Sequence, residues 1–374
     1  MKQLLSFCLV ALFVAVGTLS AQGKFSGYMF GDYFYNIARP AASMSAAALS
    51  GAKDLQGFQF RRIYFTYDND ISDQFTSRFR LEADQSALTT GSSIPVTATT
   101  NAGSYQGKIE TFVKDAYLKW KNVFEGSDFI FGIQPTTAFD ISETWWGYRS
   151  IEKTIMDLRG IIPSRDFGVA LRGKITEDGM FNYWAMIANG DGNSPVSSKF
   201  KRYSLNLQVK PADNWQATLN GDYRAQASIH DPTSTTGTLS NDIFTSSLFF
   251  GYREAGKYSL GAEAFMRMTM NGMTDPSNAP KLKSANTMGF SVFGNYSVQD
   301  NLDVVARYDY YDPNSDSNVK GDSRNYIIAG LNWKADKNVW FMPNFQIETY
   351  ESNPNGTTYG SAVTGRVTMY YVFL

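Results

Sequence analysis

Several segments of this chain alternate polar and apolar residues at every step, most clearly over 78–83, 204–209 and 216–220. A period of two is typical of a β-strand with one apolar face and one polar face. Beyond residue 21, no apolar stretch approaches the roughly 20 residues that a membrane-spanning helix needs. Strands with an apolar face can still cross a membrane if they close into a barrel, because closure satisfies every backbone N–H and C=O.

The connections between these segments are of two kinds, which alternate along the chain. Short ones, rich in turn-forming residues, lie at 69–73, 125–128, 176–179, 211–214, 253–256, 298–301 and 334–337. Long polar ones lie at 36–56, 87–106, 135–166, 191–199, 229–241, 271–284, 313–322 and 351–360. Counting the segments between them gives about 16 strands, an even number with both termini on the short-turn side. The sequence therefore predicts an all-β fold, a closed antiparallel transmembrane β-barrel with a lumen wide enough to hold water.

The N-terminus has the features of a secretory signal peptide. Lys2 precedes an apolar run over 4–16, and small residues follow up to Ala21. The run is short for a membrane-spanning helix, so we expect cleavage after Ala21; an uncleaved anchor is the alternative. The only cysteine, Cys8, lies in this segment, so a mature chain of 22–374 would hold no thiol for a disulfide or a metal site.

The C-terminal segment ends on aromatic residues. Apolar side chains alternate from Val363 to Phe373, and Leu374 follows, which looks like the signal that bacterial barrel-assembly machinery recognises. The 22 tyrosines and 27 phenylalanines suit aromatic belts at two membrane interfaces. These features predict a bacterial outer-membrane protein in contact with lipid, and a net charge of −1 gives no support for nucleic-acid binding. The alternative is a strand of a soluble β-sandwich.

The third long connection, 135–166, is the longest, and it is both charged and aromatic. Its apolar residues have a helix-like spacing over 144–159. Long loops with structure of their own are commonly functional, so we expect this one to fold into the lumen and narrow it. An external lid or a subunit contact is the alternative. The candidate constriction residues are Asp140, Glu143, Trp145, Trp146, Arg149, Glu152, Lys153, Asp157, Arg159, Arg165 and Asp166.

Charged residues within the alternating segments are expected to face the lumen, because a cation on the lipid face costs about 2–4 kcal/mol near the midplane. The candidate pore-wall residues are Arg78, Arg80, Glu82, Asp115, Lys119, Arg172, Lys174, Arg202, Arg224, Arg267, Arg307 and Arg366. Further acidic residues on the same face are Asp84, Asp222, Glu263, Asp303, Asp309 and Glu348. A nearly balanced wall predicts at most weak selectivity, slightly for anions. The alternative is that these are solvated residues paired across strands.

Residues 58–65 do not fit the alternation cleanly. Two arginines, Arg61 and Arg62, are adjacent, and strict period two places one on each face. The sequence therefore predicts that one of them lies near the lipid headgroups or is covered by a neighbouring subunit.

Catalytic and metal-binding signals are weak. The one histidine, His230, lies in a predicted external loop, without the positioned nucleophile and orienting group that a hydrolase needs. No His/Cys cluster suggests zinc, and no glycine-rich phosphate motif is present. Residues 189–193 are typical of a turn, because the later Glu of a calcium loop is missing. We therefore expect no enzymatic activity, no cofactor and no metal.

Several short motifs over the first half of the mature chain together resemble the phosphate-selective porin O and P family. They are Arg61-Arg62-Ile63-Tyr64-Phe65, Lys114-Asp115-Ala116-Tyr117, Gly132-Ile133-Gln134-Pro135, Ile151-Glu152-Lys153, Arg165-Asp166-Phe167-Gly168 and Asn189-Gly190-Asp191-Gly192. The resemblance implies a trimeric porin of about 16 strands, with an inward third loop and a basic path for anions. The family commonly has a lysine before the proline that ends strand five, where this chain has Gln134. The resemblance therefore implies the channel and its constriction loop, and not the phosphate substrate.

Two functions of different classes follow as predictions. The first is an outer-membrane porin, a homotrimeric passive diffusion channel for small hydrophilic solutes, weakly selective for phosphate-like anions. The alternative is a structural or adhesion barrel plugged by its own loops. A transporter for hydrophobic substrates needs an apolar lumen, and the predicted inner faces are too polar for one.

Overall fold

The computed structural model describes residues 23–40, 47–84 and 109–374. The predicted signal peptide, Cys8 and the cleavage point after Ala21 lie outside the described residues, as does most of the second long loop. Within the described part of the chain, no helix is both long and apolar enough to cross a membrane.

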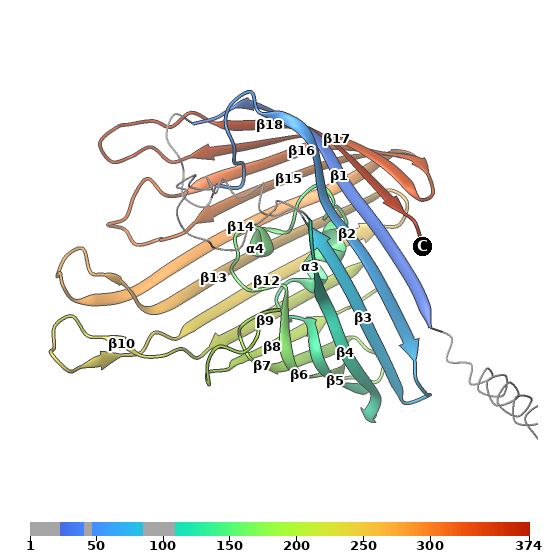
Figure 1. The fold of residues 1–374 in the computed structure, drawn as a ribbon, viewed down its shortest axis with the longest axis horizontal. Coiled ribbons are helices and arrows are strands. Elements are labelled where there is room, and N and C mark those ends of the chain that lie inside the picture. Colours follow the sequence, from blue (N-terminus) through green and yellow to red (C-terminus); the bar gives the residue numbers. More distant parts are fainter. Residues whose placement is uncertain (1–22, 41–46, 85–108) are drawn as a thin grey trace, which may run out of the picture.

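Sixteen antiparallel strands form a closed barrel, which confirms the fold class and the predicted strand count. The first and last strands, β1 (Lys24–Ala38) and β18 (Ala362–Val372), pair with each other and complete the ring. Figure 1 shows the strands running obliquely across the molecule, with the C-terminus at the same end as the start of β1. We call the β1–β18 junction the seam.

Short turns join the strands at one end of the barrel and long loops join them at the other. The remaining barrel strands are β2 (Gln56–Asp70), β3 (Phe75–Asp84), β4 (Glu110–Phe124), β5 (Ser127–Pro135), β6 (Arg165–Lys174), β7 (Phe181–Ala188), β8 (Arg202–Val209), β9 (Trp215–Arg224), β12 (Ile243–Glu254), β13 (Tyr258–Thr274), β14 (Leu282–Gln299), β15 (Leu302–Asp312), β16 (Arg324–Asp336) and β17 (Val339–Tyr350). The fifth long loop holds a small hairpin that the sequence did not predict, β10 (Ile229–His230) with β11 (Thr238–Leu239). The third holds two helices, α3 (Asp140–Trp146) and α4 (Ile155–Leu158).

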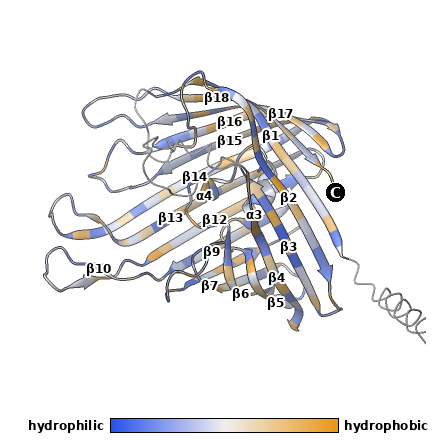
Figure 2. Cartoon of the chain, viewed as in Figure 1, coloured by the Kyte–Doolittle hydropathy of each residue, from blue (hydrophilic) through white to orange (hydrophobic). Residues whose placement is uncertain are grey.

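The outer face of the barrel is apolar, as the alternation predicts. Leu205, Leu219 and Val367 are each close to half exposed, whereas the polar neighbours Asn206 and Asn220 are buried inside. Figure 2 shows orange and blue segments following one another along the strands. Because successive side chains of a strand point to opposite faces, this pattern places apolar groups outside and polar groups inside. That arrangement suits lipid around the barrel and water within it.

A β-bulge in β2 corrects the prediction for its two arginines. Phe30 of β1 lies opposite Arg62, but the next residue, Gly31, lies opposite Phe60, so Arg61 is an extra residue in β2. An extra residue shifts the alternation by one position. Both arginines therefore point inward, and the prediction that one of them faces headgroups or a neighbouring subunit is wrong.

A second bulge lies in β4. Arg80 of β3 is opposite Asp115, whereas Leu81 is opposite Val113, so Lys114 is the extra residue. Strict alternation from Asp115 would turn Lys114 toward lipid, but the bulge turns it inward, where it is buried. The two bulges lie on either side of β3 and add cations to the same part of the inner wall.

The inner face of the second half of the barrel is partly apolar, contrary to the prediction of polar inner faces. Phe249, Phe293, Val305, Ile328 and Met342, on β12 and β14 to β17, are buried inside the ring. Each has an apolar neighbour in sequence, so these strands are apolar on both faces at this level. An apolar inner face needs a cover, and the third loop supplies it.

Candidate functional site

Loop three, residues 136–164, connects β5 to β6 and contains both helices. Gly147 caps the C-terminus of α3. It adopts the left-handed conformation with φ of 70° and donates its N–H to the carbonyl oxygen of Glu143. Residues 147–154 are irregular, and α4 begins at Ile155. The helical spacing predicted over 144–159 is therefore right only in part.

Loop three contacts strands on several sides of the ring. The Thr137 hydroxyl donates to Asn220 Oδ1 of β9 at 2.8 Å, and the Tyr148 hydroxyl donates to Asp303 Oδ2 of β15 at 3.1 Å. Arg61 of β2 donates to the carbonyl oxygen of Ile151 at 2.7 Å. Only a segment inside the ring can reach β2, β9 and β15 together.

The two tryptophans of α3 anchor the loop to the apolar inner wall. Trp146 is 1% exposed and meets Phe293 edge to face, with ring centroids 5.3 Å apart. Trp145 is also buried, and the Arg253 guanidinium stacks on it at 3.7 Å. Ile151 is fully buried in the same cluster. Trp145 and Trp146, both predicted constriction residues, therefore face the wall and hold the loop, and they do not line an open passage.

One buried carboxylate, Glu348 of β17, binds two loops. Arg159 of loop three donates from Nη1 to Glu348 Oε1 at 2.9 Å. The backbone N–H groups of Ala48 and Leu49 in loop one donate to Oε2 at 2.8 and 3.3 Å, and the Tyr350 hydroxyl does so at 2.9 Å. Loop one and loop three are therefore fastened at the same point of the wall.

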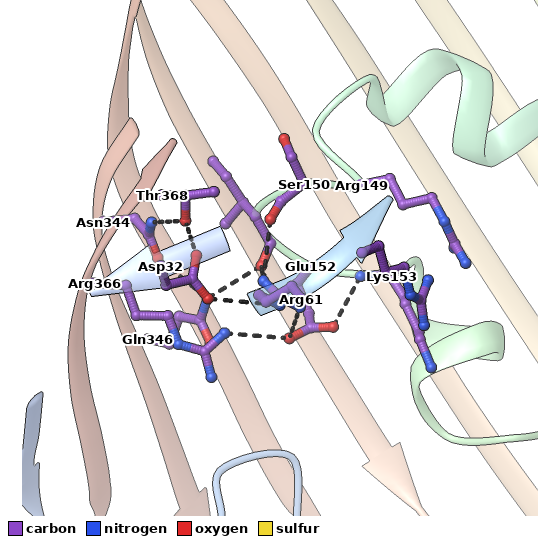
Figure 3. A network of polar contacts seen from close by, with 12 residues as sticks. Asp32, Arg61, Arg149, Ser150, Glu152, Lys153, Asn344, Gln346, Arg366 and Thr368 are labelled. Carbon is purple, nitrogen blue, oxygen red and sulfur yellow. Dashed lines mark hydrogen bonds and ion pairs between the residues drawn. The ribbon is translucent and has the colours of Figure 1, made fainter. Parts of the chain in front are cut away.

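A second buried network, drawn in Figure 3, ties loop three to the seam. Arg61 Nε lies 3.5 Å from Asp32 Oδ2 of β1, and its Nη2 lies 3.6 Å from Glu152 Oε2. Arg366 of β18 lies 3.7 Å from the same Glu152 oxygen, and Thr368 donates to Asp32 Oδ1 at 2.6 Å. Burial would raise the pKa of Glu152, but Arg61 and Arg366 lower it below its ordinary value, so this carboxylate stays charged.

The inner wall of β2 to β4 is charged. Glu82 of β3 lies between two cations, 3.1 Å from Arg62 Nε and 3.0 Å from Lys114 Nζ. Lys114 is the extra residue of the β4 bulge and Arg62 follows the extra residue of the β2 bulge, so the bulges bring both cations to this carboxylate. Asp84 Oδ2 lies 3.8 Å from Arg62 Nη2, so the four charges of this group on the wall sum to zero.

Asp115 of β4 binds two further cations in the same region. Arg165, at the start of β6, donates from Nε to Asp115 Oδ1 at 2.5 Å, and Arg80 Nη1 lies 3.5 Å from Oδ2. Asp115 is fully buried, whereas both arginines keep some exposure. This end of loop three is thus joined to the charged wall.

The middle of loop three carries its own ion group. Arg149 Nη1 lies 2.5 Å from Glu143 Oε2 and 2.6 Å from Asp157 Oδ2. Burial would raise the pKa of Asp157, but Arg149 and Lys153 hold it well below its usual range. Lys153 itself is half-buried and makes no ion pair within 4 Å among the described residues.

Most other predicted wall cations are paired with carboxylates. The pairs are Arg78 with Asp68, Lys119 with Asp128, Arg202 with Asp222, Arg224 with Asp191 and Arg307 with Asp309. Arg267 instead donates to the carbonyl oxygen of Ile161 at 3.4 Å, and Arg172 stacks over Trp184 at 4.7 Å. Lys174 is exposed beside a short turn.

Two other predicted constriction residues have structural contacts. Asp166 accepts hydrogen bonds from the N–H groups of Gly190, at 2.9 Å, and Phe167, so it holds the turn at 189–193. Asp140 is the first residue of α3, where a carboxylate stabilises the helix N-terminus.

Sequence reasoning missed Asp32 and Lys114. A signal for Lys114 existed, because Lys114-Asp115, like Arg61-Arg62, is a pair of adjacent charges inside a predicted strand. Two adjacent charges can avoid lipid together only if a bulge turns both inward. Asp32 carried no such signal, since its partners come from β2 and β18.

Candidate metal ligands do not cluster in the described part of the chain. There, no group of three or more His, Cys, Asp and Glu is placed to hold a metal ion. His230 is exposed in the β10–β11 hairpin, opposite Thr238. What loop three and the charged wall present is therefore a set of fixed charges along a lumen.

Comparison with known proteins supports the architecture. No family model matches the sequence, and no curated protein matches it. Among solved structures, the outer membrane channel DcaP of Acinetobacter baumannii has a TM-score of 0.63 at 11% identity, covering 94% of this chain and 97% of that one. An anion-selective porin from Comamonas acidovorans has 0.62 at 12% identity, covering 94% and 99%. OmpT of Vibrio cholerae has 0.59 at 13% identity, covering 94% and 97%. At these identities the likeness shows a shared fold.

Proposed function

We propose that this protein is an outer-membrane porin, a passive diffusion channel for small hydrophilic solutes. The observation that carries the proposal is the ring of sixteen strands with an apolar outer face and a charged inner wall opposite loop three. A ring of that size encloses more space than side chains alone fill. Solute would pass along the charged wall of β3 and β4, beside loop three, without any chemical conversion.

The charges support weak selectivity, leaning toward anions. Most wall cations have a carboxylate partner, which limits the net field in the lumen. Among the described residues, the cations without a carboxylate partner are Arg172, Lys174 and Arg267 of the wall and Lys153 of loop three. Phosphate specificity has no separate support, because Gln134 occupies the position before Pro135 where the porin O and P family commonly has a lysine.

The other parts of the proposal concern assembly. We infer a homotrimer in the bacterial outer membrane, since OmpT of Vibrio cholerae has been solved in a trimer form. The aromatic ending at Phe373 would be read by the barrel-assembly machinery, after removal of the signal peptide over 1–21.

The test of channel function is direct. Purified, folded protein added to planar lipid bilayers is expected to give discrete conductance steps, and heat-unfolded protein serves as the control. A folded barrel that is silent at all voltages and salt concentrations would overturn the proposal.

The second candidate is a barrel plugged by its own loops, and one observation favours it. Glu348 fastens loop one and loop three together inside the ring, which would narrow the lumen. Vesicles containing the protein should swell in small sugars if the lumen is open. No swelling with the intact protein, and swelling after deletion of 144–159, would identify a plug.

A further inference from the structure

The outer face of the barrel is hollowed beside its two shortest strands, β7 and β8. A groove of about 870 Å³ crosses β6 to β9 and β12 to β14, and it is lined mainly by outward-pointing side chains of these strands. None of the described residues of loop one or loop three lines it. The groove therefore opens to the surroundings of the barrel and is separate from the lumen.

The floor of the groove is built from small side chains. Gly221 of β9 pairs with Ser246 of β12, and Leu205 of β8 and Met266 of β13 continue the same row on either side. A Cβ atom added at Gly221 would meet nothing within 4 Å, so the wall is open at this point. A row with glycine and serine at its centre lies lower than the side chains around it, and this produces the hollow.

The edge of the groove toward the long loops is aromatic. Tyr203, Tyr223 and Phe244 are neighbours in the next row, with ring centroids 6.2 and 4.8 Å apart. The Tyr223 hydroxyl donates to Asp242 Oδ2 at 2.8 Å. Aromatic side chains with a polar tip are typical of the level at which hydrocarbon meets lipid headgroups. The groove thus lies just inside the hydrocarbon, on the long-loop side.

A cation lies just beyond this aromatic edge. The carbonyl oxygen of Lys201 accepts a hydrogen bond from the N–H of Ala225 at 3.0 Å, so the pairing of β8 with β9 extends to it. Because Arg202 is buried inside the barrel, alternation places Lys201 on the outer face with Tyr203. Lys201 makes no ion pair within 4 Å among the described residues.

The carboxylates at this end of the strands have other partners. Asp191 lies 3.9 Å from Arg224 Nη2, so these two charges offset each other. Asp242 is two strands away from Lys201 and accepts hydrogen bonds from Tyr223 and two further residues. Lys201 therefore adds positive charge at the end of β8, where a basic residue near the membrane surface attracts an anionic lipid.

We propose that this groove binds one acyl chain of a phosphorylated lipid from the surrounding bilayer, with the headgroup phosphate at Lys201. An apolar groove on the outer face meets hydrocarbon, and a flexible acyl chain is the ligand that this medium supplies. Met266, at one end of the floor, can adapt its unbranched side chain to the shape of such a chain. The inference rests on the apolar outer face of the barrel and not on the channel function, so a barrel without conductance would leave it standing.

The test uses the folded protein in phosphatidylcholine vesicles that hold a trace of phosphatidic acid with a photoactivatable diazirine on its acyl chain. Cross-linked peptides, identified by mass spectrometry, should concentrate on β8, β9 and β12 around the groove. A phosphatidylcholine probe with the same chain should label these strands about fivefold less, because one lysine near the surface favours an anionic lipid by about that factor.

Two substitutions address the two parts of the site. Gly221→Phe fills the floor, so labelling of these strands by both probes should fall to the level found elsewhere on the outer face. Ala329→Phe, at an exposed outward position of β16, is its matched control. Lys201→Gln should bring the two probes to equal labelling, whereas Lys337→Gln, in an exposed short turn, should keep the fivefold difference. Migration in unheated SDS gels verifies the folding of each variant.

Three results would overturn the inference. Even labelling around the whole barrel would show ordinary contact with lipid, which has no preferred position. Absence of labels from the groove, together with a trimer that dissociates in Gly221→Phe, would show that a second copy of the chain fills it. A fivefold preference that persists in Lys201→Gln would remove the phosphate from Lys201.

Discussion

Two parts of the inner wall, on β12 to β17 and on β2 to β4, differ in how they contact loop three. We call them the apolar half and the charged half. The wall of β12 to β17 is partly apolar, and α3 packs on its apolar side chains through Trp146, which is 1% exposed. The wall of β2 to β4 is charged, and its arginines keep some exposure, 12% for Arg62 and 17% for Arg80. The apolar half packs like a protein core and fixes the loop, while the charged half would border the water and solute of the proposed channel.

The energetics of the two halves differ for the same reason. Removing a large buried apolar side chain costs both its transfer free energy and the cavity left behind. Ion pairs on a partly hydrated wall contribute little net stability, because desolvation offsets their attraction. Stability should therefore depend mainly on the apolar half, and ion selectivity on the charged half.

The largest effect is expected on the apolar half. Trp146→Ala should lower the free energy of unfolding by about 3–5 kcal/mol and raise single-channel conductance, because α3 loses its anchor. Urea unfolding in detergent and bilayer recordings measure the two quantities. Trp333→Ala, on the outer face, is the control for loss of an indole. Equal conductance in both variants would show that Trp146 does not hold the loop.

The next effect concerns Glu348, which fastens two loops to the wall. Glu348→Gln removes the charge to which Arg159 and the N–H groups of Ala48 and Leu49 are bound, and it should cost about 2–3 kcal/mol, with rapid fluctuations of the open current as both loops loosen. Glu177→Gln, in an exposed turn, is the control. A quiet current together with unchanged stability would contradict a shared fastening.

The bulge in β2 offers a test based on register. Deletion of Arg61 removes the extra residue, so the alternation is restored and the barrel should still fold, with loop three less firmly held at Ser150 and Ile151. Deletion of Tyr64, in the regular part of β2, should prevent folding because one side of the strand exchanges faces. Folded protein can be scored by its altered migration in unheated SDS gels. The opposite ranking of the two deletions would rule out the bulge.

The smallest effect on stability is expected on the charged half. Glu82→Gln should leave Arg62 and Lys114 less neutralised and raise the chloride-to-potassium permeability ratio about threefold. Ile328→Val, on the apolar half, should cost about 1 kcal/mol and leave that ratio unchanged. If Ile328→Val moved the reversal potential as much as Glu82→Gln, ion selectivity would not depend mainly on the charged half.

The amino-acid sequence determined the architecture because its signals are local. Alternation gives each strand its two faces, and the lengths of the connections give the strand count and the end to which each turn belongs. The bulges and the apolar inner wall, which strict alternation does not predict, also have local signals in the sequence. Adjacent charges at Arg61-Arg62 and Lys114-Asp115 mark the bulges, and adjacent apolar residues on β12 and β14 to β17 mark the apolar inner wall.

Only the tertiary structure decided how loop three is held and which charges neutralise one another. Thr368 and Asp32 are 336 residues apart, and they meet only because β18 closes on β1. Arg61, Glu152 and Arg366 likewise come from β2, loop three and β18. Side-chain direction follows from the strand itself, but a contact across a lumen depends on where every strand of the closed ring stands. For that reason the charged residues could be predicted, and their partners could not.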